Sequence, residues 1–492
     1  MQKYEIDAFW PRWIFLRGLG LIFLSAFYSL AFQIHGLIGE RGILPADYYL
    51  HQVATSLGAV ERIWYAPTLF WLNTSDLALW VVVIAGIVAS LLVIFNVATR
   101  PAVAACTILF LSCIAALQDF SSYQSDGMLL EAGFISFFFA PRGARPRLGL
   151  ADPPSWLSLF MLRWEWFRIY FESGLVKILS GDPHWRNFTA MDDYYQNGPL
   201  PSWPGWYVQQ LPHWYHAGTV AFTFLVELFL VWAVFLPRRF RIACFFVVTA
   251  LQVGIIATAN YAFLNYLVLL LGVLLLDDRA LEWIRLRIAI RPEPVARSLL
   301  YRRLETGILG VALYVTATAF VMGGSESILA LPDRLLSPFR IANAYGLFAV
   351  MTPARYEIEF QGSNDGVNWI AYPFRYKPQD VREHPGFYAP YQPRFDWNLW
   401  FASLAPWQQN PWVVLTEQRL LEGSPSVLSL FRSDPFKGKP PVMLRTILWQ
   451  YWFTDVETKR RTGAWWRRQE LGPFSPPVQR GASANSVFGA PP

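Results

Sequence analysis

The chain of 492 residues is 54% hydrophobic and only 15% charged, whereas charged residues make up about a quarter of an ordinary soluble domain. Its net charge of +6 comes mainly from arginines in short segments between apolar runs, not from one basic domain, which argues against a nucleic-acid partner. This composition excludes an ordinary water-soluble enzyme and indicates an integral membrane protein.

The apolar runs predict about eight or nine transmembrane helices, because a helix needs roughly 20 apolar residues to cross the hydrocarbon core. The first run lacks the short core and cleavage site of a signal peptide, so we interpret it as a retained span. The runs at 127–140 and 262–276 are short, which leaves the count open by one. The predicted spans are residues 12–33, 77–96, 101–118, 127–140, 156–179, 217–236, 241–259, 262–276 and 304–323.

The arginines predict the orientation of these spans. Arginine-rich segments follow the fourth, sixth and eighth spans, at 142–147, 238–241 and 279–303. The connections 119–126 and 260–261 between other spans carry no Lys or Arg. Cytoplasmic loops carry an excess of these residues. We therefore expect a cytoplasmic N-terminus and an extracytoplasmic chain after the last span.

The arginine-rich segment 280–303 has a second possible role. Its apolar and arginine positions alternate at helical spacing, which suits a helix lying on an anionic membrane surface. A solvated basic loop explains the same pattern, and both interpretations stay open. Membrane lipids are thus one expected partner.

A soluble domain with many strands is predicted after the spans. Residues 354–376 alternate apolar and polar side chains around Asn364-Asp365-Gly366, which is typical of a tight hairpin turn. A helical stretch is expected at 396–431, and a second pair of strands on both sides of 457–463. The predicted fold class is therefore a polytopic α-helical membrane protein with a C-terminal mixed, strand-rich domain. The predicted domains are 1–325, transmembrane with a cytoplasmic N-terminus; 326–475, extracytoplasmic and soluble; and 476–492, a disordered tail rich in Pro, Ser and Gly.

Polar residues crowd the fourth and fifth spans and the connection after them. Charges inside a membrane are costly and are functional candidates by default. Glu131 in particular needs a cationic partner from 163–177, whereas Asp126 suits a helix N-cap. Opposite charges that neutralise one another beside an interfacial Trp185 would give a purely structural cluster, and a binding or catalytic pocket is the alternative. The predicted cluster is Asp126, Glu131, Arg163, Arg168, Glu172, Lys177, Asp182, Trp185, Arg186 and Asn187.

Other polar residues have plainer interpretations. Asn260 and Asn265 flank the break between two apolar runs, where side-chain amides can satisfy backbone groups freed by a turn at membrane depth. Among the scattered histidines, only His213 and His216 have ligand-like spacing, and an interfacial pair is the favoured interpretation. No phosphate-binding glycine loop follows a predicted strand. We therefore predict neither a metal nor a cofactor.

Several sequence blocks resemble the lipase maturation factor family. They include SGLVKILSGDPHWRNFTAMDDYYQNGPLP at 173–201, TANYAFLNYLVLLLGVLLLDD at 258–278 and NAYGLFAVMT at 343–352. Blocks such as APYQPRFDWNLWFAS at 389–403 and TGAWWRRQ at 462–469 extend the resemblance over nearly the whole chain. The resemblance implies a membrane factor that helps exported lipases, or other secreted clients, to reach their active form.

For such a factor, tryptophans of the soluble domain are candidates for client binding, since exposed apolar patches mark interaction sites. The favoured alternative is that they fill the core of the domain. No cysteine lies in a predicted extracytoplasmic segment, so disulfide exchange on a client would need a separate thioredoxin-like partner. The candidates are Trp369, Trp397, Trp400 and Trp407.

A more distant resemblance links the Lys177 region to the membrane core of vitamin K-dependent γ-carboxylases. It consists of one short block, Gly174-x-x-Lys177 with Trp185 following. It implies an alternative function, an integral membrane enzyme in which Lys177 is the base for a quinol- or lipid-like substrate, tuned by His184 or Glu172. The leading interpretation is not enzymatic.

The expected location is a bacterial inner membrane, or the endoplasmic reticulum membrane if the chain is eukaryotic. The arginine-rich composition and the lack of a four-residue retrieval signal favour the bacterial membrane. The C-terminal domain is expected on the extracytoplasmic side in either case.

Overall fold

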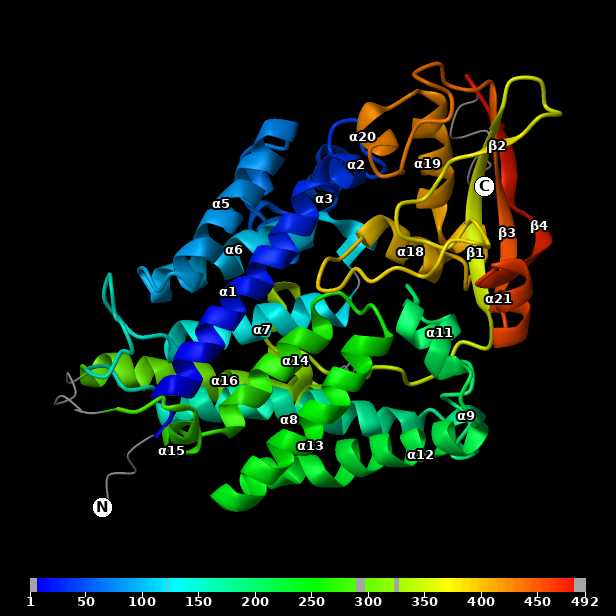
Figure 1. Cartoon of the computed structure of the whole chain (residues 1–492). Coiled ribbons are helices and arrows are strands. Elements are labelled where there is room, and N and C mark those ends of the chain that lie inside the picture. The colour runs from blue at the N-terminus through cyan, green and yellow to red at the C-terminus, as the bar shows by residue number, and fades with distance from the viewer. Residues whose placement is uncertain (1–6, 122, 289–296, 323–326, 482–492) are drawn as a thin grey trace.

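The computed structural model of the chain describes residues 7–121, 123–288, 297–322 and 327–481. It shows a bundle of helices followed along the chain by a smaller domain built on a β-sheet (Figure 1). Within the described residues, each predicted span corresponds to one helical segment. These segments are α1 (Phe9–Ala31), α5 (Asp76–Ile94), α6 (Thr99–Ala116), α7 (Gln124–Phe139), α8 (Trp156–Leu179), α12 (His213–Phe224) continued by η3 (Leu225–Phe229) and η4 (Leu230–Phe235), α13 (Arg238–Thr258), α14 (Leu264–Gly272) continued by η5 (Val273–Leu275), and α16 (Leu299–Met322).

Six of these segments in the described part of the chain are long and apolar enough to cross a membrane. They are α1, α5, α6, α13, α16 and the run from α12 through η4. The segments α7, α8 and α14 are shorter or more polar, and α8 packs against α7, α14, α16 and η3. Because helices surround α8, its charged residues face protein rather than lipid. The predicted polytopic helical part is confirmed.

Short helices form the connections between these segments. Residues 286–288 are not helical, so the described part of 280–303 is not one continuous surface helix; residues 289–296 lie outside the described residues. The short helices of the bundle are α2 (Ile34–Ile38), α3 (Ala46–Ser56), α4 (Ala59–Tyr65), η1 (Leu69–Trp71), η2 (Gln118–Ser121), α9 (Pro183–Arg186), α10 (Tyr194–Asn197), α11 (Trp203–Gln209), α15 (Asp278–Leu281), η6 (Glu282–Ile284), η7 (Ile328–Ala330), α17 (Leu331–Leu336) and η8 (Ser337–Phe339).

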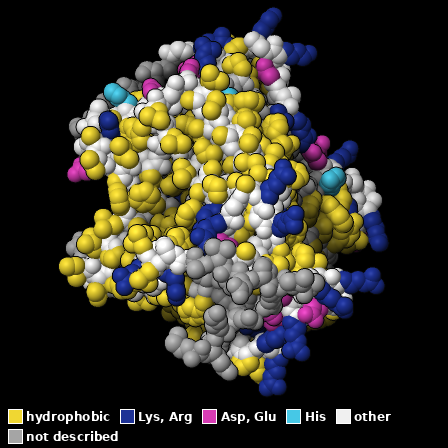
Figure 2. All heavy atoms as spheres, turned by 90° about the vertical axis from the view of Figure 1, so that its left-hand side faces the viewer, with side chains coloured by type: hydrophobic (Ala, Val, Ile, Leu, Met, Phe, Trp, Pro, Cys, Tyr) yellow, Lys and Arg dark blue, Asp and Glu magenta, His cyan; other side chains and the backbone are white. Residues whose placement is uncertain are grey.

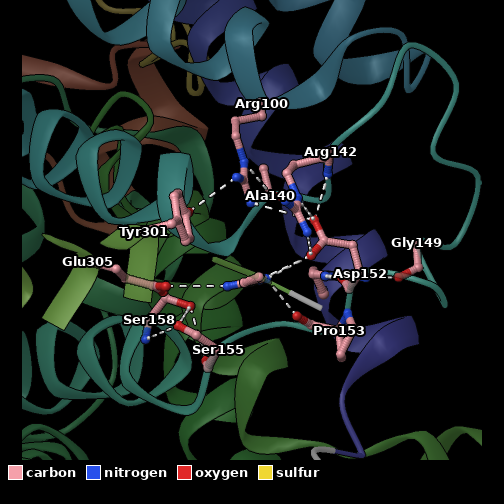
Figure 3. Close-up of polar contacts among 12 residues, drawn as sticks. Arg100, Ala140, Arg142, Gly149, Asp152, Pro153, Ser155, Ser158, Tyr301 and Glu305 are labelled. Carbon is pink, nitrogen blue, oxygen red and sulfur yellow. Dashed lines mark hydrogen bonds and ion pairs between the residues drawn. The ribbon is translucent and has the colours of Figure 1, made fainter. Parts of the chain in front are cut away.

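Arginines of two of the three arginine-rich connections, 142–147 and 279–303, gather at one end of the bundle around the carboxylate of Asp152 (Figure 3), whereas Arg238 and Arg241 of the third bind Asp277. The oxygens of Asp152 lie 3.2 Å from Nε of Arg142 and 3.0 Å from a guanidinium nitrogen of Arg297. Arg100 of α6 lies 3.7 Å away, and Arg12 of α1 donates to the backbone carbonyl of Asp152 at 2.7 Å. This end is in view in Figure 2, where Lys and Arg side chains stand out among hydrophobic ones. The segments 142–147 and 279–303, both predicted to be cytoplasmic, thus meet on one side of the molecule.

The C-terminal domain is built on an antiparallel sheet with the strand order β2-β1-β3-β4. Its strands are β1 (Arg355–Ser363), β2 (Ile370–Ala371), β3 (Met443–Phe453) and β4 (Trp466–Gln479). β1 and β2 form the hairpin predicted around Asn364-Asp365-Gly366, with Gln361 opposite Ala371. The carboxylate of Asp365 accepts from the backbone N–H of Asn368 at 2.7 Å, which closes the turn. The predicted second strand pair is β3 and β4, with α21 (Val456–Thr462) in its connection.

Two features of this domain differ from the prediction. The helical stretch expected at 396–431 is three helices and a short turn, because prolines that lack a backbone N–H start new helices. They are α18 (Arg394–Ala402), η9 (Trp407–Gln409), α19 (Pro411–Leu421) and α20 (Pro425–Leu428).

The last strand also differs from the prediction. β4 continues to Gln479, inside the segment for which disorder is predicted, since prolines are tolerated in an edge strand. Residues 482–492 of that segment lie outside the described residues.

Cysteine labelling can test the predicted orientation. The native cysteines Cys106, Cys113 and Cys244 are all buried, so single exposed cysteines can be introduced over a low background. In spheroplasts, we expect a membrane-impermeant maleimide to label Asn364→Cys in the hairpin turn. Arg145→Cys in the arginine-rich connection should react only after permeabilisation. The opposite pattern would invert the orientation.

A buried carboxyl group predicts how the stability of the C-terminal domain depends on pH. Glu417 of α19 is fully buried and accepts from Oγ of Ser475 at 3.2 Å. Burial raises the pKa of Glu417 to about 8, whereas the pKa of Glu in an unfolded chain is about 4.3. The folded state therefore holds this proton more tightly, and stability is lost as pH rises between these two values.

We expect Glu417→Gln to remove this loss, because glutamine carries no proton to give up. Its melting temperature should exceed that of the unmodified chain at pH 9, by an amount that shrinks toward pH 5. Thermal unfolding of the full chain in detergent measures this difference. Glu422→Gln, at a side chain 59% exposed just after the same helix, is the control and should show no such trend. Equal pH profiles for all three proteins would contradict the prediction.

Candidate functional site

A backbone segment without regular secondary structure, the connecting segment (residues 340–352), joins the last short helix of the bundle to β1. Polar side chains at the end of α8 and beyond it bind its backbone. Glu172 accepts from the N–H of Tyr345 at 2.6 Å and Asp182 from that of Met351 at 2.6 Å. Buried backbone N–H groups need such partners, because an unpaired one is costly. The connecting segment therefore packs as part of the bundle, whereas the sequence analysis assigns it to the soluble domain. The predicted domain boundary at 325 lies outside the described residues.

Asp182 lies in the connection after α8, and the backbone N–H groups that it binds stabilise its ionised form. Burial alone would raise its pKa, but the backbone N–H groups of Met351 and His184 outweigh burial, and the pKa of Asp182 lies below its ordinary value. Nδ1 of His184 also lies 2.8 Å from this carboxylate. His184 is thus paired with Asp182, whereas the enzymatic interpretation assigns it to Lys177.

Glu131 of α7 is the centre of a second group of contacts with the connecting segment. It is fully buried and forms an ion pair with Arg168 of α8. It also accepts from the hydroxyl of Tyr345 at 2.8 Å and from the backbone N–H of Asn343 at 3.1 Å. Arg168 is therefore the cationic partner that the sequence requires for Glu131. Arg163 bonds instead to the backbone carbonyl of Leu274, at 2.8 Å.

Asp126 links the bundle to the C-terminal domain. Both of its oxygens accept from the guanidinium of Arg394, each at 2.8 Å, and both side chains are fully buried. Asp126 lies inside α7, where it makes no capping bond, so the predicted N-cap role is wrong. Arg394 is the first residue of α18. The ion pair thus fixes α18 of the C-terminal domain against the bundle.

Lys177 pairs with a residue that the sequence interpretation missed. Its ammonium lies 2.8 Å and 3.0 Å from the two carboxylate oxygens of Glu227, and its side chain is 3% exposed. Glu227 is the single charged residue of the predicted span 217–236. That isolated charge was the signal that could have identified the partner. Trp185 lies beside the pair, with its ring centre 5.2 Å from the ammonium.

A cavity of about 290 Å³ surrounds this pair, between α8, α12, α13 and α14; we call it the Lys177 cavity. Asn265 lines it and donates to the side-chain oxygen of Gln252 at 2.8 Å, and Gln252 in turn donates to the hydroxyl of Tyr170 at 2.6 Å. Asn260 instead binds the C-terminal domain, accepting from the backbone N–H of Tyr388 at 2.7 Å. The two asparagines therefore have different structural roles.

A second space, the junction cleft, has about 340 Å³ and lies where the bundle meets the C-terminal domain. Two of the four candidate tryptophans, Trp397 and Trp400, line it and are almost fully buried. Trp369 stacks on the guanidinium of Arg445 at 4.2 Å, and Trp407 packs against the core. The cleft is lined chiefly by aromatic and apolar residues, among them Tyr123, Tyr194, Tyr261, Leu347, Phe348, Val350, Trp397, Trp400 and Phe401.

The predicted polar cluster is thus divided among several places. Asp126 binds the C-terminal domain, and Lys177 pairs with Glu227. The members that bind the connecting segment are Glu131, Arg168, Glu172, Asp182 and Trp185. Arg186 and Asn187 are exposed and lie outside both cavities. Side chains that face one another across the bundle come from distant parts of the chain, which is why spacing alone groups them too broadly.

The buried pair of Asp126 and Arg394 predicts a strong coupling between the two parts of the protein. Removing one partner leaves a buried charge without compensation, which costs about 3–5 kcal/mol. We expect Arg394→Gln to lower the stability of the full chain by this amount, and the added change Asp126→Asn to recover part of the loss. A double-mutant cycle by thermal unfolding measures the coupling. Arg432→Gln, from an exposed pair with Glu383, is the control and should cost at most about 1 kcal/mol. Additive effects of the first two changes would contradict the coupling.

Comparison with known proteins extends these findings. The model of the lipase maturation factor transmembrane domain matches residues 10–283, and that of the lipase maturation factor C-terminal domain matches residues 341–476. The chain is 30% identical to lipase maturation factor 1 of Bos taurus, over 97% of this chain and 91% of the relative. It is 31% identical to lipase maturation factor 1 of Mus musculus, with coverages of 97% and 88%, and 30% identical to lipase maturation factor 2 of Gallus gallus, with coverages of 96% and 82%. No solved structure matches the chain significantly.

Proposed function

The chain belongs to the lipase maturation factor family, and we propose that it is a membrane-anchored factor that helps exported lipases, or other secreted clients, to reach their active form. The observation that carries this proposal is the junction cleft, an aromatic space at the contact between the two domains that define the family. The helical domain anchors the factor in the membrane, and the cleft offers a client an apolar surface outside it.

The junction cleft suits a client that has not yet buried its own apolar residues. Phe401 is 46% exposed and Val350 is 67% exposed at the cleft, whereas Trp397 and Trp400 form its deeper wall. Large exposed apolar patches mark interaction sites on soluble domains. The cleft is also held in shape, because the pair of Asp126 and Arg394 fixes α18 against the bundle. A rigid site loses little conformational freedom when it binds.

The proposed factor does not itself supply a thiol for disulfide exchange. All three cysteines of the chain are buried in helices of the bundle, whereas an attacking thiolate needs access to its substrate. A client that needs disulfides would depend on a separate thioredoxin-like partner. With the predicted orientation, the junction cleft would face the periplasm of a bacterium or the lumen of the endoplasmic reticulum.

The alternative function, with Lys177 as a base, has less support from the geometry. A base needs an amine with a free lone pair, but the carboxylate of Glu227 binds the ammonium of Lys177. The proposed tuning residues are occupied elsewhere, Glu172 by the backbone of Tyr345 and His184 by Asp182. The maturation role therefore remains the leading proposal.

Substitutions at the mouth of the junction cleft can test client binding. We expect Phe401→Ala to lower the specific activity of a co-expressed secreted lipase several-fold, because the client loses an exposed aromatic contact. Phe387→Ala is the matched control, since Phe387 is a phenylalanine of the same domain with similar exposure, 45% against 46%, but does not line the cleft. Lipase activity per secreted molecule and the level of the factor are measured together.

Two outcomes would count against the proposal. Equal lipase activity with Phe401→Ala and Phe387→Ala would remove the junction cleft as the client site. Unchanged activity and oligomeric state of secreted lipases after deletion of the whole chain would remove the maturation function itself.

A further inference from the structure

We propose that the Lys177 cavity binds one uncharged amphipathic lipid, with a hydroxyl- or carbonyl-bearing head near the ion pair of Lys177 and Glu227 and its chain directed toward the bilayer. This inference is separate from the maturation of clients, because it concerns a different cavity within the helical domain. It rests on the construction of the ion pair, the charge balance of the cavity, its hydrogen-bonding groups and its mouth.

The ion pair depends on two local departures from regular helix packing. Gly174 lets η3 approach α8 closely, since an added Cβ there would lie 2.8 Å from Cβ of Glu227 and 2.9 Å from a methyl carbon of Leu228. Glu227 itself lies in the π-helical turn Leu225–Phe229, between α12 and η4. π-Helical turns are rare and frequently occur at functional sites. The local structure thus brings a carboxylate to Lys177 inside an apolar span.

The charge balance of the cavity selects an uncharged head group. Among the described residues that line it, only Lys177 and Glu227 are charged, and they neutralise each other. An anionic head would compete with Glu227 for the ammonium and leave a carboxylate unpaired in an apolar environment, which is strongly unfavourable. A cationic head would displace Lys177 in the same way. A hydroxyl or carbonyl group avoids both costs.

Polar groups beside the pair can bind such a head. The hydroxyl of Tyr170 accepts from Gln252, so its own hydrogen remains for an acceptor on the ligand. The amide of Asn265 uses one N–H on Gln252 and has a second to donate. The remaining lining is largely apolar, from residues such as Phe222, Leu251 and Val268. This arrangement of a few convergent polar groups in an apolar pocket is typical of a small-molecule site.

The cavity opens toward the outer surface of the bundle, between α12 and α13. Tyr215, Ala250 and Gly254 line it and are exposed there, and the position of a Cβ on Gly254 has no atom within 4 Å. Both helices belong to segments apolar enough to cross a membrane, so this mouth faces the lipid. The volume of about 290 Å³ accommodates a head group and the first part of a chain. The rest of the chain would lie in the bilayer.

Photoaffinity labelling can test this site. The probe is a diacylglycerol carrying a diazirine, added to the full chain in nanodiscs of phosphatidylcholine. We expect labelled peptides from α12 and α13, and competition by unlabelled diacylglycerol but not by phosphatidylglycerol. Equal competition by the anionic lipid, or labelling spread evenly over the lipid-facing helices, would overturn the proposal.

Two matched variants at open glycines test the mouth of the cavity. Gly254→Phe should lower the labelling several-fold by filling the mouth, whereas Gly310→Phe should leave it unchanged. Gly310 is exposed on α16, has no atom within 4 Å of its added Cβ, and does not line the cavity. Equal melting temperatures establish that both variants fold. Full labelling of folded Gly254→Phe would overturn the proposed entrance and the site with it.

Glu227→Gln tests the charge argument directly. This change leaves Lys177 as an uncompensated cation, so the competition should shift from diacylglycerol toward phosphatidylglycerol. Retention of the original preference in the folded variant would show that the ion pair does not select the ligand, and would overturn the assignment of an uncharged head.

Discussion

The need to satisfy the buried polar groups of an irregular backbone segment is the constraint on which this structure depends. The connecting segment has neither helix nor strand where it runs along α8, so most of its N–H and C=O groups cannot pair as they would in a regular element. A buried polar group without a hydrogen-bond partner costs roughly 1–3 kcal/mol. Glu131, Glu172 and Asp182 supply the missing acceptors. These three buried acids are therefore explained first by the backbone that they bind.

This constraint also explains how the two domains are joined. A carboxylate that is buried where it binds the connecting segment needs a cation nearby. For Glu131 this cation is Arg168 of the neighbouring helix α8. Asp126, which lies in the same helix α7 as Glu131, pairs with Arg394 of the C-terminal domain. Domains in one chain usually contact each other through polar surfaces that permit relative motion. Here the fully buried ion pair of Asp126 and Arg394 joins the domains, and the junction cleft between them has walls from both.

The sequence predicted those features that depend on neighbouring residues. The apolar runs located every helical span, and Asn364-Asp365-Gly366 located the first hairpin, because hydrophobic length and turn chemistry are local properties. The need of Glu131 for a cation from 163–177 was also predicted, and Arg168 is that cation. Pairings between more distant residues were not predicted. Lys177 meets Glu227 fifty residues later through a π-helical turn and a close glycine contact, and neither has a distinctive local pattern. The return of the connecting segment to the bundle was missed for the same reason, since its apolar sequence resembles a linker beside a soluble domain.

The connecting segment has one more consequence, which concerns the relation between the two cavities. Leu347 and Phe348 line both the Lys177 cavity and the junction cleft, as do Tyr194 and Leu264. The two spaces are therefore separated by shared side chains rather than by a complete layer of protein. Phe348 is also held by its backbone carbonyl, which accepts from the indole of Trp185 at 3.0 Å, and Trp185 in turn lies beside Lys177. A lipid that displaced Trp185 or Phe348 would change a wall of the junction cleft, so the membrane cavity and the proposed client surface share a physical boundary.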